Sequence, residues 1–486
     1  MRITTSLVAV LTATLIAGCS RPEAPAELHW RFAGGNALRT QTNAPQLAEA
    51  LQIPQAAAAS APLAARLTEV LWQVGSGGKP LTPAEVASGS VWVADLLRLP
   101  SVGEITLLPK GGHGIAVGIQ GLGQGAAAWE KNWTAFARAM QAARGGGEPA
   151  ILRQEGWVFA VSDATALPMA ATAKRLTAYR AEPGTLVQFD ARYPGSITVK
   201  AAMTASDGFA RWTGTVTTAK PLAPASSLGA WEIPGAIREP LAQFTAIRGL
   251  RALSDSLPWI KSWAGKSIPS QCFVWGQPGL PEGGHTYFAA RLEDPKSTLS
   301  EINQRLTPLF PPANPAKFRG QLDYGEKTGR LTIKGSLPVI PTFEAQKQGD
   351  LGYLTFGFVP MRHSTNALAP ELLTQLNRAN LTYYDWEFTG EATRHWHLIG
   401  QIHGLFEGRH AVQNTPGAQW LFAATPTLGE TVTEALVTGP NTLTFQRKSA
   451  LGLTGLELAA LAKWIDPVPP FRRVLPLGTN APVRKK

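Results

Sequence analysis

The stretch PKGGHGIAV at residues 109–117 returns as PEGGHTYFA at residues 281–289, and this internal match decides the fold. In both copies a P-x-G-G-H sequence precedes a run of small and apolar residues, which is typical of a turn that leads into a β-strand. The sequence therefore predicts a chain that arose by internal duplication. Two further matches support this, namely GWVF at 156–159 with GYLT at 352–355 and LVQFD at 186–190 with LTYYD at 381–385.

A third match indicates where the repeated units begin. WRFAG at residues 30–34 aligns with ARYPG at residues 191–195 and with WEFTG at residues 386–390. The chain of 486 residues is long enough for two to three domains. We therefore expect three repeat units, the last of them shortened, at residues 28–185, 186–380 and 381–465.

Hydrophobic periodicity predicts both strands and helices in these units. Residues 129, 133, 136 and 140 are large and apolar at helical spacing, and the Asp207-Gly208 dipeptide predicts a type I′ hairpin turn. The mixture favours the α+β class, with antiparallel sheets and packed helices. This layout is similar to that of large uncharacterised bacterial envelope proteins built by duplication, a resemblance that implies no activity. The expected elements are a strand at 27–33, helices within 45–73, a hairpin at 102–120, a helix at 125–143, a strand at 156–162, a helix at 166–179, a hairpin around 439–441 and a helix at 455–465.

The first residues have the charged, apolar and small-residue regions of a secretion signal. Arg2 supplies the positive charge, residues 7–16 are apolar, and Ala17-Gly18 precede Cys19. The run LIAGC at residues 15–19 resembles the lipobox of bacterial lipoproteins. A plain secreted protein is the alternative.

The lipobox resemblance implies an address for the mature chain. Residues 1–18 would be removed as a signal peptide, Cys19 would be acylated and would bind a lipid bilayer, and residues 19–27 would form a short spacer. Ser20 follows the cysteine, and in similar lipoproteins a non-acidic residue there implies the outer membrane, with the protein facing the periplasm. Several acyl chains on one residue give nearly permanent attachment.

The charge balance is strongly basic, at +11, and much of the excess lies in a Pro-rich tail at residues 466–486. In a tethered protein such a tail lies near anionic headgroups, where each basic residue adds about 1 kcal/mol; a solubilising role is the alternative. A basic protein of the cytoplasm usually binds nucleic acid. An exported chain does not normally meet it, so we expect no nucleic-acid partner.

Asp385 and Glu387 are the first candidates for catalysis. They lie two residues apart on an expected strand and so share one face, as in the acid/base pair of a glycoside hydrolase. The aligned positions of the other units hold different polar residues, with apolar or aromatic residues between them. We therefore expect a polar, solvent-exposed face with ordinary pKa values in all three units, formed by His29, Arg31, Asp190, Arg192, Asp385 and Glu387.

Other patterns in the sequence do not predict a cofactor or metal site. His395 and His397 lie two residues apart on an expected helix and point about 200° away from each other, so they cannot share a metal ion. The GLGQGA run at residues 121–126 fits a dinucleotide-binding pattern, but its strand belongs to a hairpin and the second copy lacks the glycines. His113 and His285 are interpreted as turn residues, and Cys272 as a buried apolar side chain.

These observations favour a non-catalytic envelope lipoprotein that binds a protein or a cell-wall polymer. The alternative is a hydrolase of wall glycan or peptide, with Asp385 and Glu387 as its acid and base. A second alternative is a lipid carrier, which requires a large apolar cavity. The chain has 15 tryptophans, and their helical spacing indicates a core role more than a ligand surface.

Overall fold

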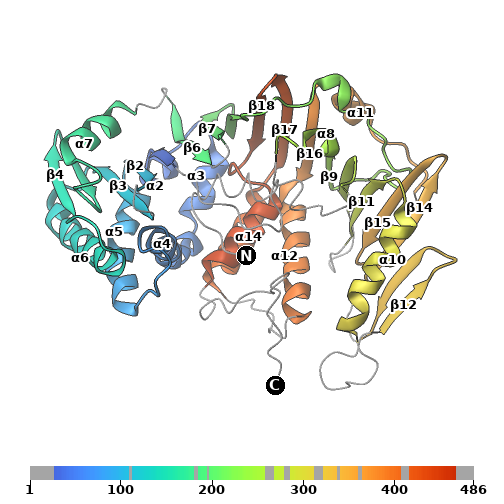
Figure 1. Ribbon diagram of the computed structural model, residues 1–486, viewed down its shortest axis with the longest axis horizontal. Coiled ribbons are helices and arrows are strands. Elements are labelled where there is room, and N and C mark those ends of the chain that lie inside the picture. Colours follow the sequence, from blue (N-terminus) through green and yellow to red (C-terminus); the bar gives the residue numbers. More distant parts are fainter. Residues whose placement is uncertain are drawn as a thin grey trace.

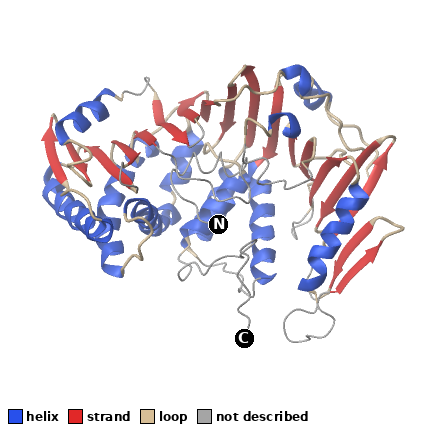
Figure 2. Cartoon of the chain, in the orientation of Figure 1, coloured by secondary structure: helices blue, strands red, loops and turns tan. Residues whose placement is uncertain are grey.

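A computed structural model describes residues 27–108, 112–179, 184–193, 196–257, 268–278, 285–310, 321–335, 340–359, 364–406 and 415–466. Its centre is one antiparallel sheet of 18 strands, which extends across the whole molecule (Figure 1). Helices lie against both faces of this sheet (Figure 2). The predicted α+β class with antiparallel pairing is therefore confirmed. Cys19 and almost all of the basic tail lie outside the described residues.

The strand order shows the duplication directly. The same eight-strand arrangement occurs twice, and the two copies meet where β8 pairs with β18. From one edge to this meeting point, the first half consists of β4 (Ala150–Gln154), β5 (Trp157–Val161), β3 (His113–Gln120), β2 (Ser101–Leu107), β1 (Glu27–Phe32), β6 (Thr185–Tyr193), β7 (Ile197–Ser206) and β8 (Phe209–Thr217).

The second half continues from the centre to the other edge in the equivalent order. A hairpin, β12 and β13, is added at its far end. The strands are β18 (Thr442–Ser449), β17 (Glu430–Gly439), β16 (Leu381–Phe388), β9 (Gln243–Arg248), β10 (Gln271–Gly276), β11 (Thr286–Leu292), β15 (Leu351–Gly357), β14 (Thr342–Gln348), β13 (Arg330–Lys334) and β12 (Gln321–Gly325).

An approximate two-fold axis passes between β8 and β18. The turns of the two central hairpins, residues 207–208 and 440–441, are equivalent, and Thr213 faces Gln446 at the centre of the β8–β18 pairing. The strand order thus divides the sheet into two halves rather than three. The expected starts at residues 186 and 381 correspond to β6 and β16, which are equivalent strands inside each half.

The two faces of the sheet can be followed through directly paired residues, whose side chains share a face. One row of such residues runs across the sheet from β5 to β15. We call the face that carries this row the inner face and the opposite face the outer face. Helices of the inner face include α4, α12, α14 and α10, whereas α7 and α11 lie on the outer face (Figure 1). The row consists of Ala160, Val117, Gly103, Trp30, Phe189, Ala201, Gly214, Phe445, Ala435, Tyr383, Ile247, Cys272, Ala290 and Leu354.

Most of the expected elements are present. The structure also contains several helices and strands that the sequence did not predict. Among the unpredicted elements are α5, β4 and β9. The helices are α2 (Gly35–Arg39), α3 (Pro45–Gln52), α4 (Pro54–Gly75), α5 (Pro83–Arg98), α6 (Ala126–Arg144), α7 (Met169–Ala178), α8 (Leu250–Leu253), α10 (Pro295–Leu306), α11 (Pro370–Leu376), α12 (Thr389–Phe406), α13 (Pro416–Ala424) and α14 (Gly455–Ile465).

The first half has a closed aromatic core between its inner face and a layer of three helices. Trp92 of α5 packs against Trp129 and Trp133 of α6, with ring centroids 6.4 and 4.8 Å apart. All three rings are almost completely buried, which confirms the core role predicted for the Trp129/Trp133 stripe. Truncating one such ring typically costs about 3–5 kcal/mol, so this cluster is a principal source of stability in the first half.

The hairpin turn predicted at Asp207-Gly208 is also confirmed. Both residues have positive φ angles, 50° and 83°, as a type I′ turn requires. This turn fixes the register of β7 and β8, which pair without interruption from Ser206 to Thr198.

Candidate functional site

The two candidate carboxylates lie on β16, near the middle of the sheet. Its sequence, LTYYDWEF, consists largely of aromatic and β-branched residues, which favour a strand. β17 and β9 flank this strand on its two sides. Asp385 is 5% exposed and Glu387 is 3% exposed. The expectation that these two side chains lie on an open, solvated face is therefore wrong.

The error comes from a shift of one residue between the two halves. The sequence match equates Asp385 with Asp190, but Asp385 lies on the inner face, with Phe189, whereas Asp190 lies on the outer face. A β-bulge between Val437 and Gly439 interrupts the register of β17, while β7 is regular. A shift of one residue moves every side chain of a strand to the other face.

In the first half the predicted polar side chains do share one face, but this face is only partly exposed: the side chain of His29 is 19% exposed, and Arg31 donates to the Tyr179 carbonyl. His29 lies 2.8 Å from Glu27, and the side chain of Arg192 is 66% exposed. The aromatic residues of the three strands do not share one core, however. Trp30 and Phe189 pack in the inner core of the first half, whereas Tyr384 and Trp386 pack on the outer face of the second half and Phe388 is exposed.

An ion pair between β18 and α14 lies beside the two carboxylates. Arg447 Nη1 and Nη2 donate to Glu457 Oε2 and Oε1 at 2.6 and 3.1 Å. The guanidinium also donates to Thr433 Oγ1 at 2.9 Å and to the carbonyl of Gly452 at 3.1 Å. Arg447 is 5% exposed and Glu457 is 2% exposed. This buried, bidentate pair attaches α14 to the sheet.

The start of α14 has a capping box that further positions Glu457. The Thr454 hydroxyl accepts a hydrogen bond from the Glu457 amide at 3.3 Å, and the Glu457 carboxylate accepts one from the Thr454 amide at 2.8 Å. Such reciprocal bonds satisfy donors at a helix N-terminus. One carboxylate therefore caps the helix and binds Arg447.

Asp385 and Glu387 have neutral hydrogen-bond donors. The Thr245 hydroxyl donates to Asp385 Oδ1 at 2.6 Å, and the Gly455 amide donates to Glu387 Oε1 at 2.6 Å. Asp385 Oδ2 is buried and has no hydrogen-bond partner among the described residues. A buried oxygen without a donor disfavours the ionised form of a carboxyl group.

The pKa values of both groups reflect this environment. Burial raises the pKa of Asp385 to about 6, against the opposing effects of the Thr245 hydrogen bond and the Arg447 charge. Burial and the charge of Asp385 raise the pKa of Glu387 well above its ordinary value. Burial alone would lower the pKa of Arg447, but Glu457 raises it overall. The two acids interact, so their proton belongs to the pair.

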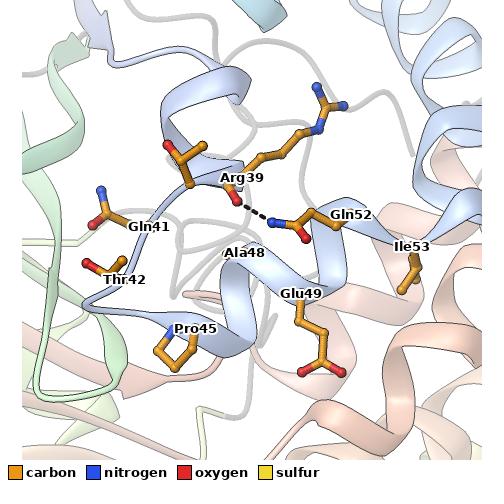
Figure 3. Close-up of a pocket in the computed structure, with 9 residues that line it drawn as sticks. Arg39, Gln41, Thr42, Pro45, Ala48, Glu49, Gln52 and Ile53 are labelled. Atoms are coloured by element: carbon orange, nitrogen blue, oxygen red, sulfur yellow. Dashed lines mark hydrogen bonds between the residues drawn. The ribbon is translucent and has the colours of Figure 1, made fainter.

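A carboxyl group that keeps its proton near neutral pH has the property of a general acid. Catalysis also requires that substrate reach it. Glu387 is covered by the start of α14, where the Gly455 amide donates to it. One oxygen of Asp385 already accepts a hydrogen bond from Thr245 of β9. A hollow among the described residues lies elsewhere, around α2 and α3 (Figure 3).

The residues that line this hollow do not suggest a catalytic or metal-binding function. Gln52 Nε2 donates to the Arg39 carbonyl at 2.5 Å across it (Figure 3). Several of its side chains, such as Thr42, Pro45 and Glu49, are exposed. Nothing in this lining forms an acid/base or metal-binding arrangement.

The histidines do not form a metal site in the described part of the chain. No group of three or more metal-ligating side chains occurs there. His395 is buried, and burial lowers its pKa to about 4, while His397 contacts Gln401 Nε2 at 2.8 Å and the ring of Phe422. His403 is a further histidine of α12, and its side chain lies outside the described residues.

The two histidines of the P-x-G-G-H stretches differ in their surroundings. His113 begins β3 and pairs with Leu107, whereas His285 precedes β11 and lies 3.4 Å from the Tyr287 hydroxyl. Cys272 packs beside an apolar cluster, and burial raises its thiol pKa to about 12. By its exposed area Cys272 is only partly buried, so the packing and the raised pKa agree with the predicted apolar side chain, but complete burial is not confirmed.

The second half has an aromatic surface on its inner face that the sequence did not predict. We define it by five rings from β11, β14, β15 and α12: Phe288, Phe343, Phe356, Phe358 and Trp396. Adjacent centroids lie 4.5 Å (Phe343–Phe356), 4.9 Å (Phe356–Phe358), 5.8 Å (Phe288–Phe356) and 6.1 Å (Phe288–Trp396) apart. Each of the five rings is only half-buried.

The reason for this incomplete burial is an asymmetry between the halves. In the first half, α2 to α5 lie in the connection from β1 to β2, and the inner-face residues Ile115, Val117 and Ile119 of β3 are fully buried. In the second half the connection from β9 to β10 is only residues 249–270. Its inner face between α12 and α10 therefore has no counterpart of α4 and α5 among the described residues (Figure 1).

None of the described helices combines the length and the apolar character needed to span a membrane. Comparison of the chain with protein-family models, with curated proteins and with solved structures found no match.

Proposed function

We propose that this protein is a membrane-anchored lipoprotein of the bacterial envelope that acts as a non-catalytic binding or scaffold protein. The address rests on the signal-like residues 1–18 and the lipobox-like run that ends at Cys19. Attachment through Cys19 would hold the folded body at the membrane surface. The basic tail after Asp466 would lie near the same surface.

The aromatic surface is the single observation that favours binding. The five rings form one contiguous apolar patch that is incompletely covered, and larger patches of this kind mark interaction sites. In the first half the same face of the sheet receives apolar helices of the chain itself. The second half offers a similar face to a partner, which we propose is another envelope protein or a cell-wall polymer.

The carboxylate pair carries less weight as a hydrolase site. Asp385 and Glu387 are almost completely buried, and both have contacts to the protein itself. A glycoside hydrolase needs room for a sugar ring between or beside its two carboxyl groups. Their raised pKa values support the hydrolase alternative, so the experiment must test it directly.

The test uses the purified chain without its signal peptide and with Cys19→Ser, mixed with isolated cell-wall sacculi or with pyrene-labelled palmitate. Sedimentation measures binding to the polymer, chromatography of the supernatant measures released fragments, and pyrene fluorescence measures binding of an acyl chain. Phe356→Ser and Phe343→Ser remove rings of the aromatic surface. Phe388→Ser is the matched control, because this exposed ring lies with Trp386 away from that surface.

Binding to sacculi without release of fragments, weakened at least about tenfold by Phe356→Ser and unchanged by Phe388→Ser, supports the polymer as partner. A protein partner is tested by a photo-cross-linking amino acid at position 356 in the native host, with position 388 as control. Fragments whose release is abolished by Asp385→Asn would establish a hydrolase instead. Saturable binding of labelled palmitate that Phe356→Ser weakens would establish a lipid carrier.

A further inference from the structure

We propose that Asp385 and Glu387 together retain one proton, and that this proton keeps the start of α14 attached to the sheet. The arrangement would be a latch that loosens as the pH rises. The latch does not depend on which partner the protein binds. It uses buried groups that have no role in the proposed binding function.

The acidic and basic groups around the pair cannot all be ionised without leaving a net negative charge. Three carboxyl groups, those of Asp385, Glu387 and Glu457, share this buried space with one guanidinium, that of Arg447. Arg447 forms both of its parallel hydrogen bonds with Glu457. With every group ionised, two negative charges would remain away from water, which is strongly unfavourable.

The other groups that face the pair do not supply the missing positive charge. Among the described residues, the charged and titratable neighbours are Glu457 on α14, Arg447 on β18 and Tyr383 on β16. β9 and β17 contribute the hydroxyls of Thr245 and Thr433. Neutral hydroxyls stabilise a carboxylate less than a cation does.

The hydrogen bond from α14 does not depend on which member of the pair holds the proton. Glu387 accepts from the amide of Gly455, the first residue of α14, and the positive end of a helix favours a carboxylate. Asp385 has one oxygen without a donor. A proton on either carboxyl group leaves an oxygen of Glu387 that can accept from Gly455, so the protonated pair is compatible with a seated helix.

The start of α14 is tightly seated and has no room to adjust. A Cβ added at Gly455 would overlap the backbone of Ala392 and Thr393 at the first turns of α12. Repulsion between two ionised carboxylates beneath this point therefore cannot be relieved by a small shift of the helix. It is relieved when the N-terminal turn of α14 detaches and water reaches the carboxylates.

The direction of the pH effect follows from the raised pKa values. The pKa of Asp385 is about 6 in the folded protein, above its ordinary 3.8, because of burial. A raised carboxyl pKa gives stability that is fully present below the unfolded pKa and is lost as the pH rises through the folded pKa. Stability therefore begins to be lost above about pH 6, where Asp385 ionises, and falls further when Glu387, whose pKa is raised well above its ordinary value, loses the proton that the pair retains.

The test is amide hydrogen exchange of the full mature chain, followed by peptide mass spectrometry at about pH 5.5 and about pH 8.5 with correction for intrinsic rates. We expect protection of residues 455–465 to fall by about tenfold or more at the higher pH. Protection of α6 should not change. Asp385→Asn, which resembles the protonated acid, should keep α14 protected at both pH values.

Asp190→Asn is the matched control, because it removes the aspartate that aligns with Asp385 but lies on the outer face. It should behave as the wild type does. Equal protection of residues 455–465 at both pH values in the wild type would overturn the proposal. So would a pH dependence that survives in Asp385→Asn.

A second measurement on the wild type does not depend on the folding of any variant. Infrared difference spectra across the titration should show the carbonyl band of one protonated buried carboxyl group at neutral pH. Its absence at neutral pH would refute a retained proton. Its presence without any change in α14 exchange would refute the latch.

Discussion

Replacing Arg447 with methionine is the most direct test of the charge balance beneath α14. The substitution keeps an apolar stem of similar length and removes four hydrogen bonds, to Glu457 Oε1, Glu457 Oε2, Thr433 Oγ1 and the Gly452 carbonyl. It leaves three buried carboxyl groups with no cation. Removing one partner of a buried ion pair typically costs about 3–5 kcal/mol, and we expect Arg447→Met to lie in this range at neutral pH.

The assay is urea unfolding monitored by tryptophan fluorescence. Adding Glu457→Gln to Arg447→Met removes one of the three carboxyl groups and keeps an oxygen that can accept from the Thr454 amide. We expect the double variant to recover about 2 kcal/mol relative to Arg447→Met alone. Lys463→Met is the control, because it removes a cation from the exposed side of α14 and should change stability by no more than about 0.5 kcal/mol.

The pH dependence of these variants sharpens the test. Without the charge of Arg447 the folded pKa values of Asp385 and Glu387 rise further, so the variant should lose least stability at about pH 5 and most at about pH 8. The reasoning would be refuted if Arg447→Met cost less than about 1 kcal/mol at neutral pH, or if its cost did not depend on pH.

Three other predictions concern separate parts of the molecule. Gly214→Ala should destabilise by about 1–3 kcal/mol, because a Cβ there overlaps the Phe445 ring and the Lys200 carbonyl; Phe445→Leu should relieve part of this in equilibrium unfolding. Cys272 should resist iodoacetamide in the native state at about pH 8 and react after denaturation, because burial raises its pKa to about 12; native labelling at the denatured rate would contradict this. Cys19→Ser should leave an unprocessed precursor without acyl label, and labelling of the variant equal to the parent's would refute lipidation.

Local signals in the sequence predicted a large part of the fold. Asp207-Gly208 determined a turn by itself, and the tryptophan stripe of α6 needed only its spacing. A further signal was present but was not used: Thr82 and Glu85 form a capping box at the start of α5, and the TPAE sequence is typical of that motif. β9 was not predicted, and the match of WRFAG with ARYPG and WEFTG, which equates β1 with β6 and β16, led to three units instead of two.

The candidate site was located by sequence, but its environment was not. The spacing of Asp385 and Glu387 correctly placed both side chains on one face of a strand. Which face they occupy depends on the bulge in β17, and bulges shift the register without leaving a periodic pattern in the sequence. The ion pair of Arg447 with Glu457 depends on tertiary packing of α14, which no spacing within β16 can indicate.

A dimer of identical subunits must carry each side chain twice, whereas two halves fused in one chain are free to differ. Gly214 and Arg447 are equivalent across the axis between β8 and β18. With glycine at both positions Glu457 would lose its cation, and with arginine at both the side chain at position 214 would collide with Phe445. Two halves that differ in sequence avoid this conflict. One half has a closed, tryptophan-rich core, and the other has buried ionisable groups and an aromatic face whose five rings are half-buried.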